Sequence, residues 1–392
     1  MNGADLAWTV VLAFGAAVVG TGAVMTLINL RVMRRPGGAP PQDAPPANGA
    51  PRISVCVPAR NEERNLGECV GSLLRSRGVA VEVLVYDDHS TDSTPAILAR
   101  LIAEDPRVRA VATRGLPPGW NGKQFGCQQM GESARGEWLL FTDADVRFHP
   151  DALATALAEA RRLQVQLLST VPRQETGSIL EHLVVPLIHF ILLSYLPMPR
   201  MRRSRDPAAS AGCGQFLLVE RRAWEAAGGH AGFRDSMHDG IRLPRAVRRA
   251  GGRSDLYDGT PWVSCRMYRG AGACFRGFAK NAFEGLGSVT LLVMLTLMHL
   301  AGHLAPWLWL AWAAWSGRWT PAPTALAALC IAVAALQRGL MAIRFRQSWL
   351  GVLLHPVGIL AMTVIQWWSL VLALRGRREW RGRVAGVESA SA

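Results

Sequence analysis

Two aspartates one residue apart, Asp143 and Asp145, have the clearest capacity for chemistry. They follow a short apolar run, residues 138–142, of the kind that forms a strand buried on both faces. In extended backbone, residues i and i+2 project to the same side, so both carboxylates face one small volume. Such carboxylates repel each other unless a cation lies between them, and a divalent cation can also hold phosphate oxygens. The pattern therefore predicts a metal and phosphate site, with a pair of solvated turn residues as the alternative.

Alternating strands and helices surround this motif. Strands are predicted over 53–57 and 81–86, with a helical segment over 62–77 between them. Such an order, with short turns, indicates a parallel sheet covered on both faces, and ligands bind at the carboxyl ends of its strands. Polar clusters follow three of the predicted strands: Pro58-Ala59-Arg60-Asn61-Glu62, Asp87-Asp88 and Asp143-Ala144-Asp145. No GxGxxG follows the first strand and no Walker motif is present, which argues against a dinucleotide or P-loop site.

A long apolar segment, Ala7 to Leu30, precedes this region and is long enough to cross a bilayer. Arg31, Arg34 and Arg35 follow it at once, which places the downstream chain in the cytoplasm. A cleaved signal peptide would need a basic first region, and the only charged side chain before Ala7 is acidic. We therefore predict a signal anchor.

The C-terminal part is also apolar. Residues 286–374 contain three hydrophobic segments and form a predicted membrane domain. His299 and His303 share one helical face there, and a hydrogen bond between helices is favoured over a metal or haem pair. Four spans would place the C-terminus outside, yet the arginines after Leu374 favour the cytoplasm. Either the last segment re-enters the membrane or one segment does not span it.

A further apolar segment, near residues 179–198, contains Glu181 and two histidines, so it is predicted to lie in the membrane interface. An ordinary buried helix pair is the alternative. The net charge of +14 lies largely beside apolar stretches, which favours anionic lipid headgroups as partners over nucleic acid. Seven scattered cysteines without CxxC spacing indicate reduced thiols in a cytosolic compartment.

Taken together, the segments Val57-Pro58-Ala59-Arg60-Asn61-Glu62, Tyr86-Asp87-Asp88-His89-Ser90 and Thr142-Asp143-Ala144-Asp145 resemble family 2 glycosyltransferases. The stretch from Gly115 to Lys123 is similar to the membrane branch that glycosylates carotenoid-type or hopanoid-type lipids. The resemblance implies an α/β fold class, a GT-A (Rossmann-like) mostly parallel sheet domain with N-terminal and C-terminal transmembrane helices. The predicted order is an anchor over 1–35, a linker over 36–51, the glycosyltransferase domain over 52–285, transmembrane helices over 286–374 and a basic tail over 375–392.

The resemblance also implies roles for particular residues. Asp143 and Asp145 would hold Mg²⁺ or Mn²⁺ beside the diphosphate, and Lys123 would approach the diphosphate unless it is a solvated loop lysine. An acceptor-side strand follows Gly212, Cys213 and Gly214, and the cysteine is expected to be a packing residue. The nucleotide-sugar contacts implied are Pro58, Ala59, Glu62, Asp87, Asp88, Lys123 and Asp143.

Two departures from the family pattern concern the chemistry. The family usually has Glu-Asp where this chain has His238-Asp239, and Asp239 is the expected general base, with His238 as the alternative. The family's QxxRW motif is absent, which argues against a processive polymer synthase.

The predicted function is metal-dependent, inverting transfer of a hexose from a nucleotide sugar, of the UDP type, to an apolar lipid such as a carotenoid or other isoprenoid. The predicted location is the inner (plasma) membrane, multi-pass, with the catalytic domain in the cytoplasm. The alternatives are a cell-envelope glycan transferase and a catalytically inactive membrane scaffold on the same fold.

Overall fold

The computed structural model describes residues 3–37, 51–375, 379–380 and 383–384, so most of the predicted linker and of the basic tail lies outside the described residues. Chain contacts divide the protein into two compact units. The sheet unit comprises Met33–Glu175, Met198–Met267 and Gly376–Ala392. The helical unit comprises Met1–Val32, Thr176–Pro197 and Tyr268–Arg375.

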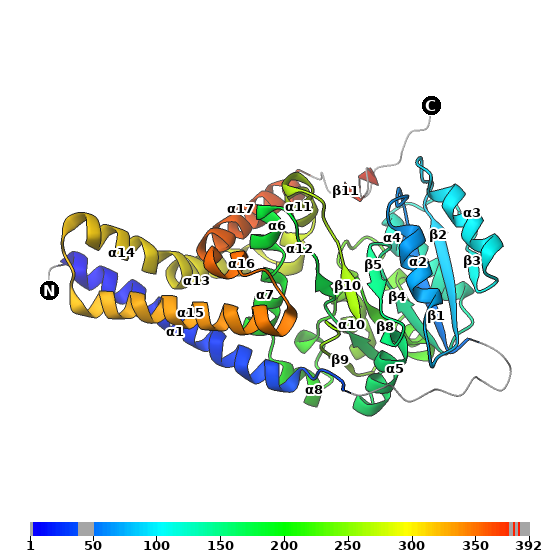
Figure 1. The fold of residues 1–392 in the computed structure, drawn as a ribbon, viewed down its shortest axis with the longest axis horizontal. Helices are drawn as coiled ribbons and strands as arrows, with labels where there is room; N and C mark the ends of the chain where they lie inside the picture. The colour runs from blue at the N-terminus through cyan, green and yellow to red at the C-terminus, as the bar shows by residue number, and fades with distance from the viewer. Residues whose placement is uncertain (1–2, 38–50, 376–378, 381–382, 385–392) are drawn as a thin grey trace. The chain divides into compact units, whose positions relative to one another are not determined.

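The sheet unit is built on a seven-stranded sheet with the order β3-β2-β1-β4-β8-β6-β9 within the described residues (Figure 1). Neighbours pair in parallel except β8, which is antiparallel to both β4 and β6. The predicted mostly parallel α/β sheet is thus confirmed. The strands are β1 (Ile53–Ala59), β2 (Val81–Asp87), β3 (Val108–Ala110), β4 (Trp138–Phe141), β6 (Leu167–Ser169), β8 (Leu217–Glu220) and β9 (Ser254–Leu256).

Helices cover both faces of this sheet because alternate strand residues are apolar on both sides. Val55 and Val83 contribute to the core beneath α2, α3 and α5, whereas Cys56 and Leu84 contribute to the core beneath α4, α9 and α10. The helices are α2 (Leu66–Leu74), α3 (Thr94–Glu104), α4 (Gly122–Ser133), α5 (Ala152–Leu163), α8 (Met198–Arg203), α9 (Arg221–Ala226) and α10 (Asp239–Arg249), with 3-10 turns η1 (Pro207–Ala209) and η2 (Ala231–Phe233).

Helix α2 begins later than the predicted residue 62. Asn61 has a φ of +54°, in the left-handed region, so the chain turns there before it can enter a helix. The Glu62 carbonyl then accepts hydrogen bonds from the Asn65 and Leu66 amides, which starts the helix at Leu66. The turn keeps residues 60–62 at the end of β1, beside the loop that follows β2.

A smaller three-stranded sheet adjoins the carboxyl end of β4. Its order is β5 (Val146–Phe148), β10 (Val263–Cys265) and β7 (Arg173–Gln174). Cys265 pairs with Val146 on one side and with Gln174 on the other. The turn that carries Asp143 and Asp145 therefore lies between the two sheets. A separate hairpin, β11 (Glu379–Trp380) with β12 (Arg383–Val384), belongs to the C-terminal segment.

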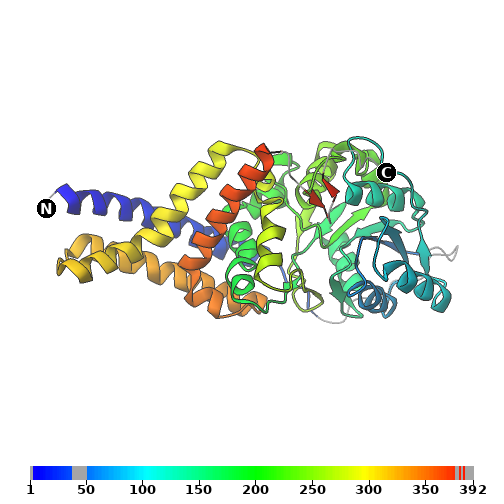
Figure 2. The same cartoon turned by 90° about the horizontal axis from the view of Figure 1, so that it is seen from above.

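Among the residues that the structure describes, the helical unit contains four helices that are long and apolar enough to cross a membrane. They are α1 (Gly3–Val32), the continuous α13 (Val289–His299), η3 (Leu300–Leu304) and α14 (Ala305–Ser316), then α15 (Pro321–Phe345), and α17 (His355–Leu374). Helices α1 and α15 pack against each other, and Figures 1 and 2 show both running through the helical unit. Segment η3 is a π-helix, which no sequence pattern predicted.

Shorter helices complete this unit: α6 (Ile179–Val184), α7 (Leu187–Tyr195), α11 (Ala271–Ala279), α12 (Ala282–Leu286) and α16 (Leu350–Leu353). The predicted interfacial segment is divided at Pro186 into α6 and α7, and α7 packs against α1. One polar side chain of α1 anchors this segment: Asn29 Nδ2 donates hydrogen bonds to the Leu193 and Leu196 carbonyls at the end of α7.

Candidate active site

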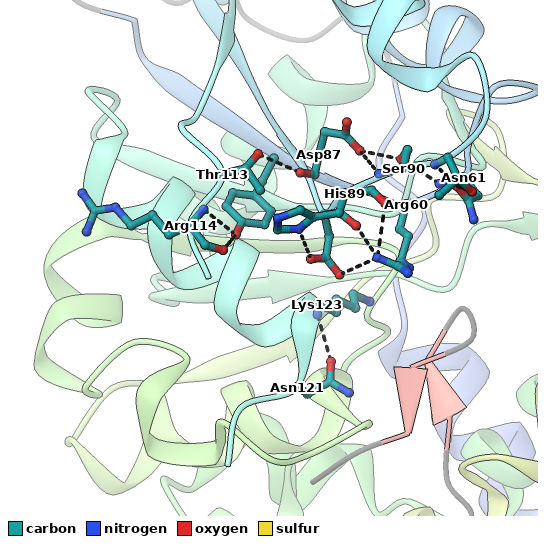
Figure 3. Close-up of polar contacts among 12 residues, drawn as sticks. Arg60, Asn61, Asp87, His89, Ser90, Thr113, Arg114, Asn121 and Lys123 are labelled. Atoms are coloured by element: carbon teal, nitrogen blue, oxygen red, sulfur yellow. Dashed lines mark hydrogen bonds and ion pairs between the residues drawn. The ribbon is translucent and has the colours of Figure 1, made fainter. Parts of the chain in front are cut away.

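Lys123 joins two carboxylates that are far apart in sequence. Its Nζ lies 2.7 Å from Asp143 Oδ1 and 2.9 Å from Asp239 Oδ2. Lys123 is held in the first turn of α4, where the Asn121 side chain caps the helix by accepting a hydrogen bond from the Lys123 amide (Figure 3). Through these two ion pairs, the turn after β4, which carries Asp143, and the first turn of α10, which carries Asp239, both contact the same lysine. Three of the predicted site residues meet here.

The electrostatics of this group fix its charges. Burial disfavours the Lys123 ammonium, but Asp143 and Asp239 outweigh that effect and raise the lysine pKa well above its usual value. Burial likewise disfavours the Asp239 carboxylate, and Lys123 more than compensates, so the pKa of Asp239 is lowered. Lys123 and Asp239 are therefore both charged at neutral pH.

The small residues of the predicted acceptor-side segment make room for Asp239. A Cβ on Gly214 would lie 2.1 Å from Asp239 Oδ1, and a Cβ on Gly240 would lie 2.7 Å from the Gly212 carbonyl oxygen. Only glycine permits this approach between residues 212–214 and the start of α10. Gly214 and Gly240 therefore allow the predicted site segment 212–214 to pack against Asp239. Burial raises the pKa of the Cys213 thiol between them to about 12, as for a packing residue and not a nucleophile.

Asp145 is held separately from Asp143. It hydrogen-bonds the Cys265 thiol of β10, whose pKa is raised by burial and by Asp145. Gln215 Nε2 lies 3.0 Å from the same sulfur, and the Gln215 carbonyl accepts a hydrogen bond from Thr142 Oγ1. The two aspartates thus lie in one turn but have different partners, a lysine for one and a thiol for the other.

The turn after β4 offers a divalent cation few protein ligands of its own. Within the described part of the chain, no group of three or more His, Cys, Asp or Glu side chains could hold a metal ion. Asp143 and Asp145 supply two carboxylates, and Mg²⁺ commonly takes one or two protein carboxylates and completes its shell with phosphate oxygens and water. The residues present therefore fit a cation that is bound together with a diphosphate.

The loops after β1 and β2 are joined by polar contacts (Figure 3). Arg60 Nη1 lies 2.5 Å from the Asp88 carbonyl oxygen and 3.6 Å from Asp88 Oδ2. The Asn61 side-chain oxygen Oδ1 accepts a hydrogen bond from the Thr91 backbone amide, and the Asn61 backbone N–H donates a hydrogen bond to Ser90 Oγ. These contacts fix both loops at the edge of the sheet where Lys123 also lies.

The predicted nucleotide residues differ in what they can offer a ligand. Asp88 is 2% exposed and lies against Arg60, whereas Asp87 is half-buried and receives hydrogen bonds from Ser90 on its Oδ1. Glu62 is buried and accepts a hydrogen bond from Asn65. Pro58 and Ala59 are buried inside β1, and the Ala59 carbonyl accepts a hydrogen bond from the Asp88 amide.

His238 precedes α10 and differs from Asp239 in its surroundings. Its amide donates to Ser236 Oγ, its carbonyl accepts from the Ile241 and Arg242 amides, and it is half-buried. Asp239 is 5% exposed and forms the ion pair with Lys123. Of the two adjacent candidates for the base, the aspartate is the one in contact with the lysine.

Sequence reasoning gave no role to several residues that shape this site. Arg60, Gln215 and Cys265 hold the loops and the second aspartate, and none of them belongs to a pattern that predicts such contacts. His230 is fully buried and accepts a hydrogen bond from Trp224 Nε1; burial lowers its pKa to about 3. The Gly-Gly pair before His230 indicates a turn but not this burial.

Comparisons with known proteins agree with this arrangement. Residues 54–227 match the family described as Glycosyl transferase family 2. The chain is 28% identical over 258 residues to 4,4'-diaponeurosporenoate glycosyltransferase of Staphylococcus aureus strain MRSA252, covering 64% of this chain and 67% of that protein. The protein of the same name from strain USA300 is 29% identical over 259 residues, with the same coverage.

Among solved structures, a mannosyltransferase from Pyrobaculum calidifontis, determined in complex with GDP-Man and Mn²⁺, superposes with a TM-score of 0.57 at 19% identity. That match covers 92% of this chain and 99% of the mannosyltransferase, and it identifies the fold. The chain is therefore similar to family 2 glycosyltransferases over residues 54–227, and it has the GT-A type of fold, a mostly parallel α/β sheet, seen in the solved mannosyltransferase.

Proposed function

We propose that the protein transfers a hexose, with inversion, from a nucleotide sugar to an apolar lipid in a metal-dependent reaction. The observation that carries this proposal is the single lysine shared by Asp143 and Asp239. An ammonium group at this point stands between a carboxylate suited to a metal and a carboxylate suited to proton removal. Both contribute when the oxygen of an acceptor hydroxyl displaces a nucleoside diphosphate.

In this proposal the loops after β1 and β2 bind the nucleoside. Asp87 would accept hydrogen bonds from the ribose or base, because it is the more accessible of the two adjacent aspartates. Pro58, Ala59 and Glu62 would form the wall of the pocket, and Asp88 would hold Arg60 in place. A UDP sugar is the donor we propose; the solved mannosyltransferase was determined with GDP-Man.

Asp143 and Asp145 would hold Mg²⁺ or Mn²⁺, and the solved mannosyltransferase of the same fold was determined with Mn²⁺. A bound cation stabilises negative charge on a leaving diphosphate. Lys123, which contacts both carboxylates, would also form an ion pair with the diphosphate. Its high pKa keeps it protonated, so it acts as a fixed positive charge and not as an acid.

Asp239 would act on the acceptor. Its carboxylate takes the proton of an acceptor hydroxyl while the acceptor oxygen bonds to the anomeric carbon, and the bond from that carbon to the phosphate oxygen breaks with both electrons remaining on the diphosphate. An acceptor carboxylate would need no proton removal, and Asp239 would then only orient it. The lowered pKa of Asp239 keeps it ionised and ready to accept a proton.

The lipid acceptor is proposed from two facts. The described residues include four helices that could cross a membrane by length and composition, and relatives of the chain are named 4,4'-diaponeurosporenoate glycosyltransferase. A carotenoid-type or other isoprenoid acceptor in the plasma membrane fits both. We place the sheet unit in the cytoplasm, where nucleotide sugars are available.

The test is a transfer assay with the full chain in lipid nanodiscs. Purified protein is mixed with UDP-glucose, UDP-N-acetylglucosamine or GDP-mannose, a carotenoid-containing lipid extract and MgCl₂ or MnCl₂. We expect a glycosylated lipid of increased mass, whose anomeric proton shows inversion, and no product with a chelator. Donor binding without any product in extracts of several sources would favour the inactive scaffold, and a polar glycan product would favour the cell-envelope transferase.

A further inference from the structure

A second group of polar side chains lies inside the helical unit, around the ring of Phe190 on α7. His303 and His355 have ring centroids 5.4 Å and 5.0 Å from that ring, and the Arg338 guanidinium carbon lies 6.0 Å from its centroid. These side chains come from η3, α17 and α15, which are separate segments of the unit. His299 adjoins them, with its ring centroid 5.8 Å from that of His303. We call this set the Phe190 cluster.

Arg338 is the unusual member of the Phe190 cluster because it is 0% exposed. Its Nη1 contacts Met341 Sδ at 3.7 Å and Gln347 Oε1 at 3.4 Å. Its Nε and Nη2 have no hydrogen-bond acceptor, and its charge has no ion-pair partner, among the residues that the structure describes. A guanidinium removed from water is costly unless an anion faces it. The free N–H groups are the two that form a fork toward a carboxylate or phosphate.

The two histidines offer a further donor. His355 Nε2 and His303 Nδ1 are 3.2 Å apart, so one of them donates to the other. A neutral imidazole carries one N–H, so a neutral pair has two, and only one is used between the rings. Whichever way the bond runs, the pair retains one N–H, on His303 Nε2 or on His355 Nδ1. The predicted hydrogen-bonding role of His299 and His303 is confirmed, since His299 Nε2 also lies 3.0 Å from the Tyr195 hydroxyl.

The backbone around the Phe190 cluster is shaped for close approach. His303 lies in the π-helix η3, and π-turns within α-helices occur frequently at functional sites. The Ala301 carbonyl of that turn faces Gly15 of α1, where a Cβ would lie only 2.3 Å from its oxygen. On the other side, a Cβ on Gly351 of α16 would lie 3.7 Å from Arg338 Nη2. Glycine therefore lets α1 pack closely on η3, and it lets α16 pack on the His182 carbonyl beside Arg338.

We propose that Arg338, with the spare N–H of the His303–His355 pair, binds the anionic head of a lipid, either a carboxylate or a phosphate. The positive guanidinium excludes a metal cation, although three histidines are near. The helices that surround the cluster present large apolar side chains on their outer surfaces, such as Leu329, Leu336 and Val364, as expected for an environment of acyl chains. The proposal does not rest on the sugar donor or on the residues of the sheet unit.

Thermal unfolding of the full chain in an uncharged maltoside detergent tests this binding. The probes are oleate and dioleoyl phosphatidic acid, and their uncharged counterparts are oleyl alcohol and dioleoylglycerol. We expect an anionic probe to raise Tm by about 4 °C or more near saturation, and its counterpart to raise Tm much less. A shift with oleate alone assigns a carboxylate, and a shift with phosphatidic acid assigns a phosphate headgroup. Equal shifts for charged and uncharged lipids would overturn the proposal.

Variants then locate the site. In Arg338→Gln the anion-dependent shift should disappear, whereas Arg346→Gln, which removes an exposed arginine beyond the end of the same helix, should keep it. Should Arg338→Gln fail to fold, Arg338→Lys retains the charge but lacks the planar fork, and it should keep less than half of the shift. An undiminished shift in either Arg338 variant would contradict the assignment. Because the readout is binding, an inactive transferase would not affect the result.

Discussion

The role of Lys123 can be tested through the ionisation of Asp239. Burial alone would raise the pKa of this carboxylate, and the lysine reverses the shift. In the wild type the pKa of Asp239 therefore lies below its ordinary value of 3.8, and the carboxylate is ionised throughout the range from pH 5 to 8. The pH profile of kcat/KM should then show no loss of rate on the acid side of this range from protonation of Asp239. In Lys123→Met the pKa rises, and an acid limb should enter this range. The test is to measure kcat/KM of the wild type and of Lys123→Met between pH 5 and 8. If the two profiles were the same, Lys123 would not control the ionisation of Asp239.

The base assignment makes a separate prediction. Asp239→Asn should lower turnover about 10²–10⁴-fold with donor binding largely kept, because only proton removal is lost. His238→Gln should cost much less, since its backbone begins α10 while Asp239 contacts Lys123. Turnover at saturating donor is measured for both variants and for the double mutant, whose non-additivity would reveal a coupled pair. Near-normal turnover in Asp239→Asn beside an inactive His238→Gln would assign the role to the histidine.

Asp145 is the residue that tests the metal. Asp145→Ala should abolish transfer and remove the response to added Mg²⁺ or Mn²⁺, because a ligand for the leaving diphosphate's cation is lost. The control is Asp151→Ala, which replaces an acidic residue at the start of α5, beyond β5. Full activity of Asp145→Ala in the presence of a chelator would exclude a metal at this position.

At the scale of elements, the close contact between residues 212–214 and α10 is a point of strain for any larger side chain. In Gly214→Ala the new Cβ would overlap Asp239 Oδ1, so the Asp239 carboxylate must move from its present position beside Lys123. We expect a loss of about 1–3 kcal/mol in unfolding free energy and a larger loss of turnover than of donor affinity. Gly115→Ala is the matched control, because nothing lies within 4 Å of its Cβ. Equal turnover in the two variants would show that the contact has no functional role.

Local patterns predicted the elements of the sheet unit because each strand is an apolar run that ends in polar residues. The same patterns placed Asp87, Asp143 and Asp145 at the correct edge, since parallel strands share one carboxyl end. They could not predict that Lys123 reaches Asp239, 116 residues away, because that contact depends on how α4 and α10 pack. The start of α2 and the π-turn at His303 were likewise missed, as both depend on contacts with other segments.

At the scale of the whole molecule, the orientation of the sheet unit can be measured by labelling introduced cysteines. The native cysteines should react little with the label, because six of them, Cys69 included, are buried and Cys213 is partly buried. Glu104→Cys places a thiol on an exposed position of α3, whose side chain is 61% exposed. Because Arg31, Arg34 and Arg35 lie at or just beyond the C-terminal end of α1, we expect an impermeant maleimide to label this thiol only after cells are permeabilised. Labelling in intact cells would place the sheet unit outside.

The position of the C-terminus follows from the neighbours of α17. This helix packs mainly against α6, α11, α12 and η3, whereas α1 packs mainly against α15, η3 and α7. The helix therefore belongs to a different layer of the helical unit from the α1–α15 pair, although its length and composition would allow it to cross a bilayer. The sequence beyond it contains Arg375, Arg377, Arg378, Arg381 and Arg383.

Since clustered arginines are retained on the cytoplasmic side, we expect α17 not to cross the membrane and the C-terminus to be cytoplasmic. A green fluorescent protein fused after Ala392 should fluoresce, and an alkaline phosphatase fused there should be inactive. Replacing the five arginines by glutamine should weaken this preference, while the same change at Arg318 and Arg346, outside this segment, should not. An active phosphatase fusion on the native sequence would show that α17 crosses the bilayer and that packing against α6, α11 and α12 does not hold it on the cytoplasmic side.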